Sequence, residues 1–174
     1  MGRLDEVKGV SRIINSLKNI PYEDINEVNI VGDGEQIYKY IKEADFLKNK
    51  IFFHGAQSKN FVHEQMKKSH FFLLPSQAEG FPKVVAEAAG YGVIPIVSNV
   101  GSIAHYINEK NGFLWEINKN EKGYDKVLKE AMASDEFSLE KKSIEIVKLA
   151  ELFTFDNYLK KLKFNLYQGN NSIN

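Results

Sequence analysis

The stretch Leu74-Pro75-Ser76-Gln77-Ala78-Glu79-Gly80-Phe81-Pro82-Lys83-Val84-Val85-Ala86-Glu87-Ala88 says more about the fold of this chain than any other segment. An apolar run at 70–74 ends in Pro-Ser, and an alanine- and valine-rich run begins near Pro82. The first run is typical of a buried strand and the second of a helix, because proline fits the first helical position. We therefore expect a strand, a polar loop and a helix start in direct succession.

The loop between this strand and this helix has the composition of a ligand site. Free backbone N–H groups around Gly80 should point into the loop, where the positive end of the helix dipole favours an anion such as phosphate. Glu79 precedes the helix start and Glu87 lies about a turn and a half inside it, so the two carboxylates flank the start. Ionised carboxylates accept strong hydrogen bonds from hydroxyl groups, such as those of a sugar and a ribose on either side of a diphosphate. As an isolated pair the two glutamates are more simply solvated charges that favour the dipole; within the full loop we favour a ligand site.

Short β-rich runs alternate with longer amphipathic stretches along the chain. The expected strands are at 28–31, 51–53, 71–74, 93–97 and 112–115, and the expected helices at 7–17, 35–46, 59–67 and 82–90. This alternation predicts an α/β fold with a mostly parallel sheet covered by helices. Such sheets bind ligands beyond the carboxyl ends of their strands. The candidate residues that follow predicted strands are Gly32, His54, Ser76, Glu79, Ser98 and Gly101.

The carboxyl-terminal part of the chain is expected to be helical. Residues 124–167 read as two or three helices, with breaks near Ser134-Asp135 and Thr154. The length of 174 residues and a hydrophobic content of 43% suit one sizeable core. We expect a single domain over 1–168, with its helical tail at about 124–168, and a disordered end at 169–174.

Composition argues against several classes of protein. Basic and acidic side chains number 23 each, so the formal net charge of zero gives no sign of nucleic-acid binding. Cysteine is absent, and the 4 histidines have spacings that match no zinc motif, so we expect no metal site. The apolar runs are far shorter than the ~20 residues that span a bilayer, and no secretory signal is visible. A cytoplasmic protein is the simplest expectation.

Glu79 and Glu87, with Gly80-Phe81-Pro82 between them, resemble the acidic motif of retaining glycosyltransferases of the GT-B fold, in particular the family 4 group. Further motifs extend the resemblance over nearly the whole chain: Gly2-Arg3-Leu4 with Lys8-Gly9, Val31-Gly32-Asp33-Gly34, Phe53-His54-Gly55, Ala88 through Gly92, Pro95 and Gly101. Each motif is weak alone, but their order and spacing together are specific. The resemblance implies the carboxyl-terminal half of that fold, a Rossmann-like, mostly parallel sheet with helices on both faces.

The resemblance also implies roles for individual residues. Glu79 would hold hydroxyls of the transferred sugar, while Arg3 and Lys8 would neutralise the diphosphate leaving group; these three form the implied catalytic set. Glu87 would bind the ribose hydroxyls. The implied donor-binding residues are Gly32, Ser76, Gly80, Phe81, Pro82 and Glu87. The substrate would be a nucleotide-diphosphate sugar, and neither a metal nor another cofactor is then required.

Two departures from the family pattern qualify this expectation. The first strand of this half normally runs into Gly-Arg-Leu, yet only Met1 precedes Gly2, so we expect a truncated first strand. The amino-terminal, acceptor-binding domain of the GT-B fold is absent from the sequence. We therefore expect half of a hexosyltransferase, inactive alone, that works with the missing domain or a partner chain on a saccharide or lipid-linked acceptor. The full enzyme would serve polysaccharide biosynthesis in the cytoplasm or at the inner face of the membrane.

Two alternatives remain beside the glycosyltransferase. One is a non-catalytic nucleotide-binding subunit that partners a separate acceptor-binding chain. The other is an epimerase-like enzyme acting on a nucleotide-sugar. A nicotinamide-dependent reaction is disfavoured, because Gly32-Asp33-Gly34 begins a dinucleotide fingerprint but Ile37 stands where its third glycine would fall. The sequence leaves the base, the sugar and the acceptor open, with UDP favoured only by its frequency in the family.

Overall fold

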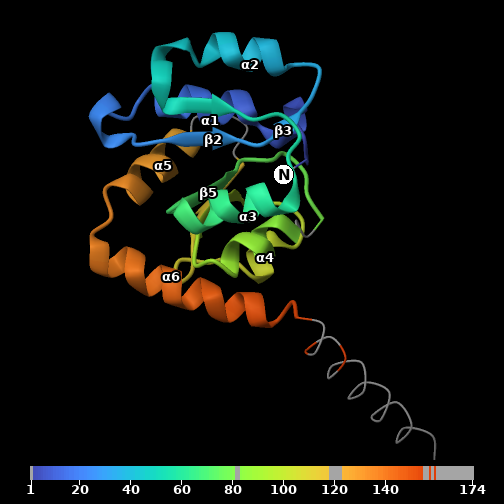
Figure 1. Cartoon of the computed structure of the whole chain (residues 1–174). Helices are drawn as coiled ribbons and strands as arrows, with labels where there is room; N and C mark the ends of the chain where they lie inside the picture. Colours follow the sequence, from blue (N-terminus) through green and yellow to red (C-terminus); the bar gives the residue numbers. More distant parts are fainter. Residues whose placement is uncertain (1, 81–82, 118–122, 155–156, 158, 160–174) are drawn as a thin grey trace, which may run out of the picture.

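The computed structural model describes residues 2–80, 83–117, 123–154, 157 and 159, with side chains from Leu4 onward (Figure 1). Its strands are β1 Gly2–Arg3, β2 Val28–Ile30, β3 Gly32–Asp33, β4 Ile51–Phe53, β5 Phe71–Leu74, β6 Ile94–Ser98 and β7 Phe113–Trp115. Its α-helices are α1 Val10–Leu17, α2 Ile37–Glu43, α3 Lys59–Lys68, α4 Lys83–Ala89, α5 Tyr124–Met132 and α6 Glu136–Glu151. Short 3-10 helices lie at Glu6–Lys8, Tyr22–Asp24, Asp45–Lys50 and Ile103–His105.

The strand pairs of the described chain are all parallel, but they fall into three separate sheets. β1 pairs with β3, β2 pairs with β4, and β5, β6 and β7 form a three-stranded sheet in that order. Crossover helices connect parallel strands because the chain must return to the same end of the sheet. The α/β class with parallel strands and covering helices is thus confirmed.

Helices cover both faces of the strands. On one face, Ile13 and Leu17 of α1 and Leu128 of α5 share a core cluster with Ile96 of β6. On the other face, α4 and α6 pack together against Val97 of the same strand. Figure 1 shows α1 and α2 on one side of β5 and α3, α4 and α6 on the other. β6 is buried at every residue, as expected for an apolar strand covered on both faces.

Most predicted elements agree with the structure to within a residue or two at each end. The helix expected at 7–17 is the main exception, because it is broken at Gly9, which has φ of +76°. Before the break, Asp5 caps the 3-10 helix by accepting a hydrogen bond from the Lys8 backbone N–H at 3.2 Å.

The structure describes parts of the two ends of the chain. The first strand is short, since β1 comprises only Gly2–Arg3. The expected break near Ser134-Asp135 is confirmed: α6 begins after Asp135, whose carboxylate accepts a hydrogen bond from the Ser138 N–H at 3.0 Å. The predicted disordered end at 169–174 and most of the tail beyond Thr154 lie outside the described residues. Across the described ranges, no helix combines the length and apolar character needed to cross a membrane.

Candidate functional site

The loop that follows β5 is held by the turn that precedes α1. The Gln77 N–H donates to the Val7 carbonyl at 2.8 Å, and Arg12 Nη1 donates to the Pro75 carbonyl at 2.6 Å. Gly9 lies so close to this loop that an added Cβ would stand 2.4 Å from the Pro75 oxygen. Only glycine suits a positive φ with backbone at that distance, so Gly9 fixes the approach of the two segments.

This approach brings together two residues that the sequence separates widely. Lys8 Nζ lies 2.7 Å from Glu79 Oε1, within range of a charge-assisted hydrogen bond. The Glu79 side chain is 9% exposed and the Lys8 side chain 36%. A carboxylate this buried needs a partner, which Lys8 provides. The more exposed ammonium has three N–H donors, so it can also serve an anion in the open part of the site.

The loop after β6 supports Glu79 from the other side. A Cβ on Gly101 would lie 1.9 Å from the Glu79 carbonyl oxygen, and Gly101 has φ of +56°. Ser102 donates to the Gly80 carbonyl from its N–H at 3.4 Å and from its hydroxyl at 3.3 Å. Gly80 itself has open space where a Cβ would stand. Ser102 therefore anchors the Gly80 carbonyl and Gly101 packs against the Glu79 carbonyl, while Gly80 leaves open space for a ligand.

Ser76 lies deeper in the same loop. It is fully buried, as is Ser98 at the end of β6, and neither hydroxyl has a hydrogen-bond partner among the described atoms. A buried hydroxyl without a partner is costly, so both serines mark the carboxyl ends of β5 and β6 as polar positions within the core. The donor-binding role expected for Ser76 stays a prediction.

The predicted glycine-rich turn is explained in part by packing. Gly32 is buried with φ of +142°, and its N–H donates to the Gly55 carbonyl at 2.8 Å. A Cβ on Gly34 would lie 2.5 Å from the Leu4 carbonyl oxygen. Beside them, the His54 ring nitrogen Nε2 lies 2.6 Å from the side-chain oxygen of Asn29. These contacts join the ends of β2, β3 and β4, and they place Gly32 at the carboxyl edge of the strands.

The remaining predicted site residues are Glu87, Arg3, Phe81 and Pro82. Glu87 is exposed on α4, several residues beyond the start of that helix. The backbone of Arg3 lies in β1, paired with Asp33, but its side chain is not described. Phe81 and Pro82 lie outside the described residues, so their expected contacts with a donor stay predictions. Among the described side chains, no group of three His, Cys, Asp or Glu gathers where it could hold a metal ion.

Sequence reasoning missed Arg12. Besides its bond to Pro75, its guanidinium carbon lies 4.8 Å from the centre of the Trp115 ring, so it links the loop after β5 to the end of β7. The available signal was its position, four residues after Lys8 in a stretch expected to be helical. Residues so spaced share a helix face.

Known proteins that resemble this chain are glycosyltransferases and share its fold. The sequence profile of the family described as glycosyl transferases group 1 matches residues 1–148. An Escherichia coli UDP-Gal:alpha-D-GlcNAc-diphosphoundecaprenol alpha-1,3-galactosyltransferase is 40% identical over 93 residues, which cover 51% of this chain and 24% of that protein. This chain spans about a quarter to a third of the length of its first curated relatives.

Two solved structures illustrate the shared fold. Anabaena HepE, solved in complex with UDP, has a TM-score of 0.79 and 18% identity over 96% of this chain and 48% of its own. The catalytic domain of cholesterol-alpha-glucosyltransferase from Helicobacter pylori has a TM-score of 0.75 and 20% identity over 88% of this chain and 96% of its own. At these identities the likeness establishes the fold.

Proposed function

This chain belongs to the glycosyl transferases of group 1, and from that premise we propose that it binds the nucleotide-sugar donor of a sugar-transfer reaction. The observation that carries the proposal is the Lys8–Glu79 pair at the carboxyl end of β5. It combines a partly exposed cation with a carboxylate beside open backbone at Gly80. The cation can bind a phosphate, and the carboxylate can accept a hydrogen bond from a sugar hydroxyl.

In this mechanism the chain stabilises charge as the bond to the sugar breaks. The departing nucleoside diphosphate gains negative charge at the oxygen that leaves the sugar. Lys8 offers its ammonium to that charge, and Arg3 adds a second cation from β1. A fixed cation binds the transition state more tightly than the ground state, and this difference accelerates the reaction.

Glu79 holds the transferred sugar in the proposal. Its carboxylate accepts hydrogen bonds from sugar hydroxyls, while its contact with Lys8 holds it in position. The amides of Gly80 and Phe81 contact the sugar or the distal phosphate. On α4, Glu87 accepts hydrogen bonds from the ribose hydroxyls. Gly32, Ser76 and Pro82 complete the donor site as backbone or packing positions.

The finer assignment is a retaining hexosyltransferase of the family 4 type that uses a UDP-sugar. Support comes from the E. coli relative, whose name states a UDP-Gal donor, and from HepE, solved with UDP and glucose. Lys8 and Arg3 supply the positive charge for the diphosphate, so the proposed mechanism uses neither a metal nor another cofactor.

The acceptor belongs to a part of the enzyme outside these 174 residues. We assign it to a separate acceptor-binding domain or partner chain, and we expect this chain alone to be inactive in transfer. The name of the E. coli relative includes a lipid-linked saccharide acceptor, which supports a saccharide or lipid-linked acceptor here. Such an acceptor suits polysaccharide biosynthesis by a cytoplasmic enzyme at the inner face of the membrane. No observation favours the non-catalytic subunit or the epimerase-like enzyme.

The proposal is tested by isothermal titration of the chain with UDP, GDP and ADP, and then with the matching nucleotide-sugars. We expect one diphosphate to bind and Lys8→Met to weaken it by roughly ten- to a hundredfold, the range for a lost charge-assisted hydrogen bond. Lys67→Met is the matched control, because Lys67 forms a 2.7 Å ion pair with Glu64 on the exposed surface of α3. Equal binding by the Lys8 variant and the parent chain would contradict the proposed site.

A further inference from the structure

The side chain of Arg12 reaches from α1 to the loop after β5. Its Nη1 donates to the Pro75 carbonyl at 2.6 Å. Hydrogen bonds from a charged donor are roughly twice as strong as those between neutral groups. Pro75 begins the loop directly after the last residue of β5, and Glu79 follows it four residues later. The bond therefore fixes the start of the segment that carries Glu79.

Buried aromatic rings support the Arg12 guanidinium. Its central carbon lies 4.8 Å from the centre of the Trp115 ring, and Trp115 is only 2% exposed. The Trp115 ring meets the Tyr124 ring nearly edge to face, with centroids 5.6 Å apart and an interplanar angle of 78°. Tyr124 is fully buried at the start of α5. A planar guanidinium stacks well on an aromatic face, so Arg12 presents its N–H group to Pro75 from a rigid support.

Gly9 leaves room for this contact. A Cβ on Gly9 would stand 2.7 Å from Arg12 Nη1, as well as 2.4 Å from the Pro75 oxygen. A side chain at this position would therefore push the guanidinium away from the carbonyl. Lys8 lies directly before Gly9, and Glu79 follows Pro75 in the same loop. The contact among Arg12, Gly9 and Pro75 thus ties together the two segments that carry the Lys8–Glu79 ion pair.

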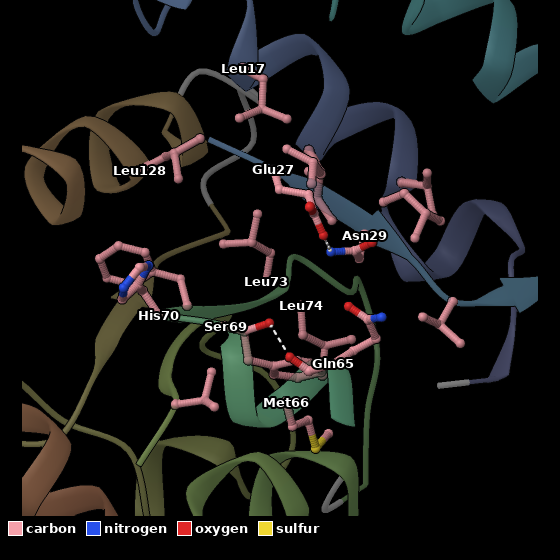
Figure 2. Close-up of a pocket in the computed structure, with 18 of the residues that line it drawn as sticks. Leu17, Glu27, Asn29, Gln65, Met66, Ser69, His70, Leu73, Leu74 and Leu128 are labelled. Carbon is pink, nitrogen blue, oxygen red and sulfur yellow. Dashed lines mark hydrogen bonds between the residues drawn. The ribbon is translucent and has the colours of Figure 1, made fainter. Parts of the chain in front are cut away.

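The contacts of Arg12 are separate from the apolar groove between β2 and β5. A cavity of about 520 Å³ lies in this groove, and Figure 2 shows Leu17 and Leu73 among the side chains around it. Arg12, Pro75 and Trp115 are not among the residues that line the cavity. The bond between Arg12 and Pro75 therefore does not depend on what occupies the groove.

We propose that Arg12 is a positioning residue for the sugar donor: it holds the loop after β5 in the place where Glu79 can bind the transferred sugar. This inference rests on the donor binding proposed above. Arg12 acts through the Pro75 carbonyl, while Lys8 and Glu79 remain the groups that contact the donor. A misplacement of about 1 Å can cost roughly a hundredfold in rate, so a support several residues from Glu79 can decide how well Glu79 works.

The loop has a second tether to the same turn. The Gln77 N–H donates to the Val7 carbonyl at 2.8 Å. Because main-chain groups form this bond, a substitution of Arg12 leaves it available. We therefore expect an Arg12 variant to displace the loop rather than to unfold the chain. The displacement should appear at Glu79, as a weaker contact with Lys8 and weaker binding of the sugar.

The coupling between Arg12 and the ion pair can be measured without a ligand, by urea denaturation of the full chain. Arg12→Met keeps an unbranched side chain but removes the charge and the N–H donor. Lys8→Met should lower the urea midpoint less in the Arg12→Met chain than in the parent, because the displaced Glu79 has already lost contact with Lys8. Gly55→Ala is the control, since an added Cβ there meets no atom within 4 Å, and it should shift the midpoint equally in both backgrounds.

Titration calorimetry then measures the coupling between Arg12 and the sugar contact. The probe is UDP-galactose, or the nucleotide-sugar that the parent chain binds most tightly in the titrations above. Arg12→Met should weaken its binding roughly fivefold or more. In the Glu79→Gln background the same substitution should weaken binding by less than about twofold, because the group that Arg12 positions has already been changed. In the Glu87→Ala background it should keep its full effect, since Glu87 lies on α4.

The outcomes separate this inference from the function on which it rests. If the parent chain binds no nucleotide-sugar, the proposed function is wrong and the donor role of Arg12 falls with it. If the parent binds and Arg12→Met has the same effect with and without Glu79, Arg12 only stabilises the fold and the inference is overturned. Unchanged affinity in Arg12→Met, or equal effects of Lys8→Met in both backgrounds, would also overturn it. If Arg12→Met does not fold, Arg12→Gln replaces it in both measurements, because glutamine is polar but too short to reach Pro75.

Discussion

Lys8 Nζ contacts Glu79 Oε1 at 2.7 Å although 71 positions of sequence separate the two residues. The contact forms because the turn at Gly9 packs against the Pro75 carbonyl, which brings the end of the 3-10 helix Glu6–Lys8 to the loop after β5. Glu79 is nearly buried there, so the ion pair contributes both to the fold and to the chemistry proposed for the site.

Removing the cation of this pair should destabilise the chain. In Lys8→Met the Glu79 carboxylate loses its ammonium partner in a poorly solvated position, at a cost of roughly 1–3 kcal/mol in the free energy of unfolding. Urea denaturation followed by circular dichroism measures this change. Lys67→Met removes a solvated ion pair of the same length and should leave the midpoint unchanged. A midpoint shift of the same size in both variants would show that the Lys8–Glu79 contact has no special role in the fold.

Glu79 should distinguish a nucleotide-sugar from the nucleotide alone. We expect Glu79→Gln to weaken binding of the nucleotide-sugar roughly tenfold or more, because the loss of charge weakens hydrogen bonds from the sugar hydroxyls. Binding of the nucleoside diphosphate should change little. Titration calorimetry with both ligands gives the comparison, and Glu64→Gln on the α3 surface is the control. Equal losses with the two ligands would mean that Glu79 does not hold the sugar.

Glu87 should act at the other end of the donor. Because its side chain is exposed on α4, Glu87→Ala should leave the thermal midpoint intact. The variant should lose roughly 1.5–3 kcal/mol of binding free energy for the nucleoside diphosphate, as expected for hydrogen bonds to a charged group. The same titrations measure the loss. An unchanged affinity would exclude the ribose contact.

Close backbone packing should make Gly101 far less tolerant of substitution than Gly55. Both have positive φ, +56° and +65°, so alanine strains either position by roughly 1–2 kcal/mol. At Gly101 the new Cβ would also stand 1.9 Å from the Glu79 carbonyl, whereas at Gly55 no atom lies within 4 Å. Gly101→Ala should therefore lower the unfolding midpoint well beyond Gly55→Ala and displace the Glu79 loop. Similar midpoints would show that the loop gives way without cost.

Alkaline unfolding should report on Tyr124. Burial raises the pKa of Tyr124 above its ordinary value of 10.0, and its hydroxyl faces the Ile96 carbonyl at 3.4 Å. The folded chain therefore keeps the proton to higher pH than the unfolded chain does. Its contribution to stability is complete below about pH 10 and falls as pH rises above that value, where only the unfolded tyrosine ionises. Urea midpoints measured from pH 9 upward should decline less steeply in Tyr124→Phe.

Tyr38→Phe is the control for this pH dependence, because Tyr38 is 83% exposed. Its removal should leave the slope of the parent chain unchanged. If Tyr124→Phe declined as steeply as the parent chain, ionisation of Tyr124 would not be a cause of alkaline unfolding.

Local sequence patterns predicted the elements around the site closely. The apolar runs at 51–53 and 71–74 are the strands β4 and β5 as expected, because each run is short, apolar and bounded by polar or turn residues. The prediction of one continuous helix at 7–17 was wrong at Gly9. A positive φ at glycine is compatible with both a turn and a helix cap, and contact with Pro75 decides the conformation here. β3 was missed because two residues carry no periodic signal.

The sequence by itself determined the order of strand, loop and helix, the apolar faces that build the core, and the motifs that identify the family. These properties depend on neighbouring residues and on side-chain periodicity, which are local. Only the tertiary structure decided that Lys8 meets Glu79, that Arg12 holds Pro75, and that an apolar groove separates β2 from β5. Such contacts depend on how distant backbone segments pack together, and side-chain periodicity does not encode that packing.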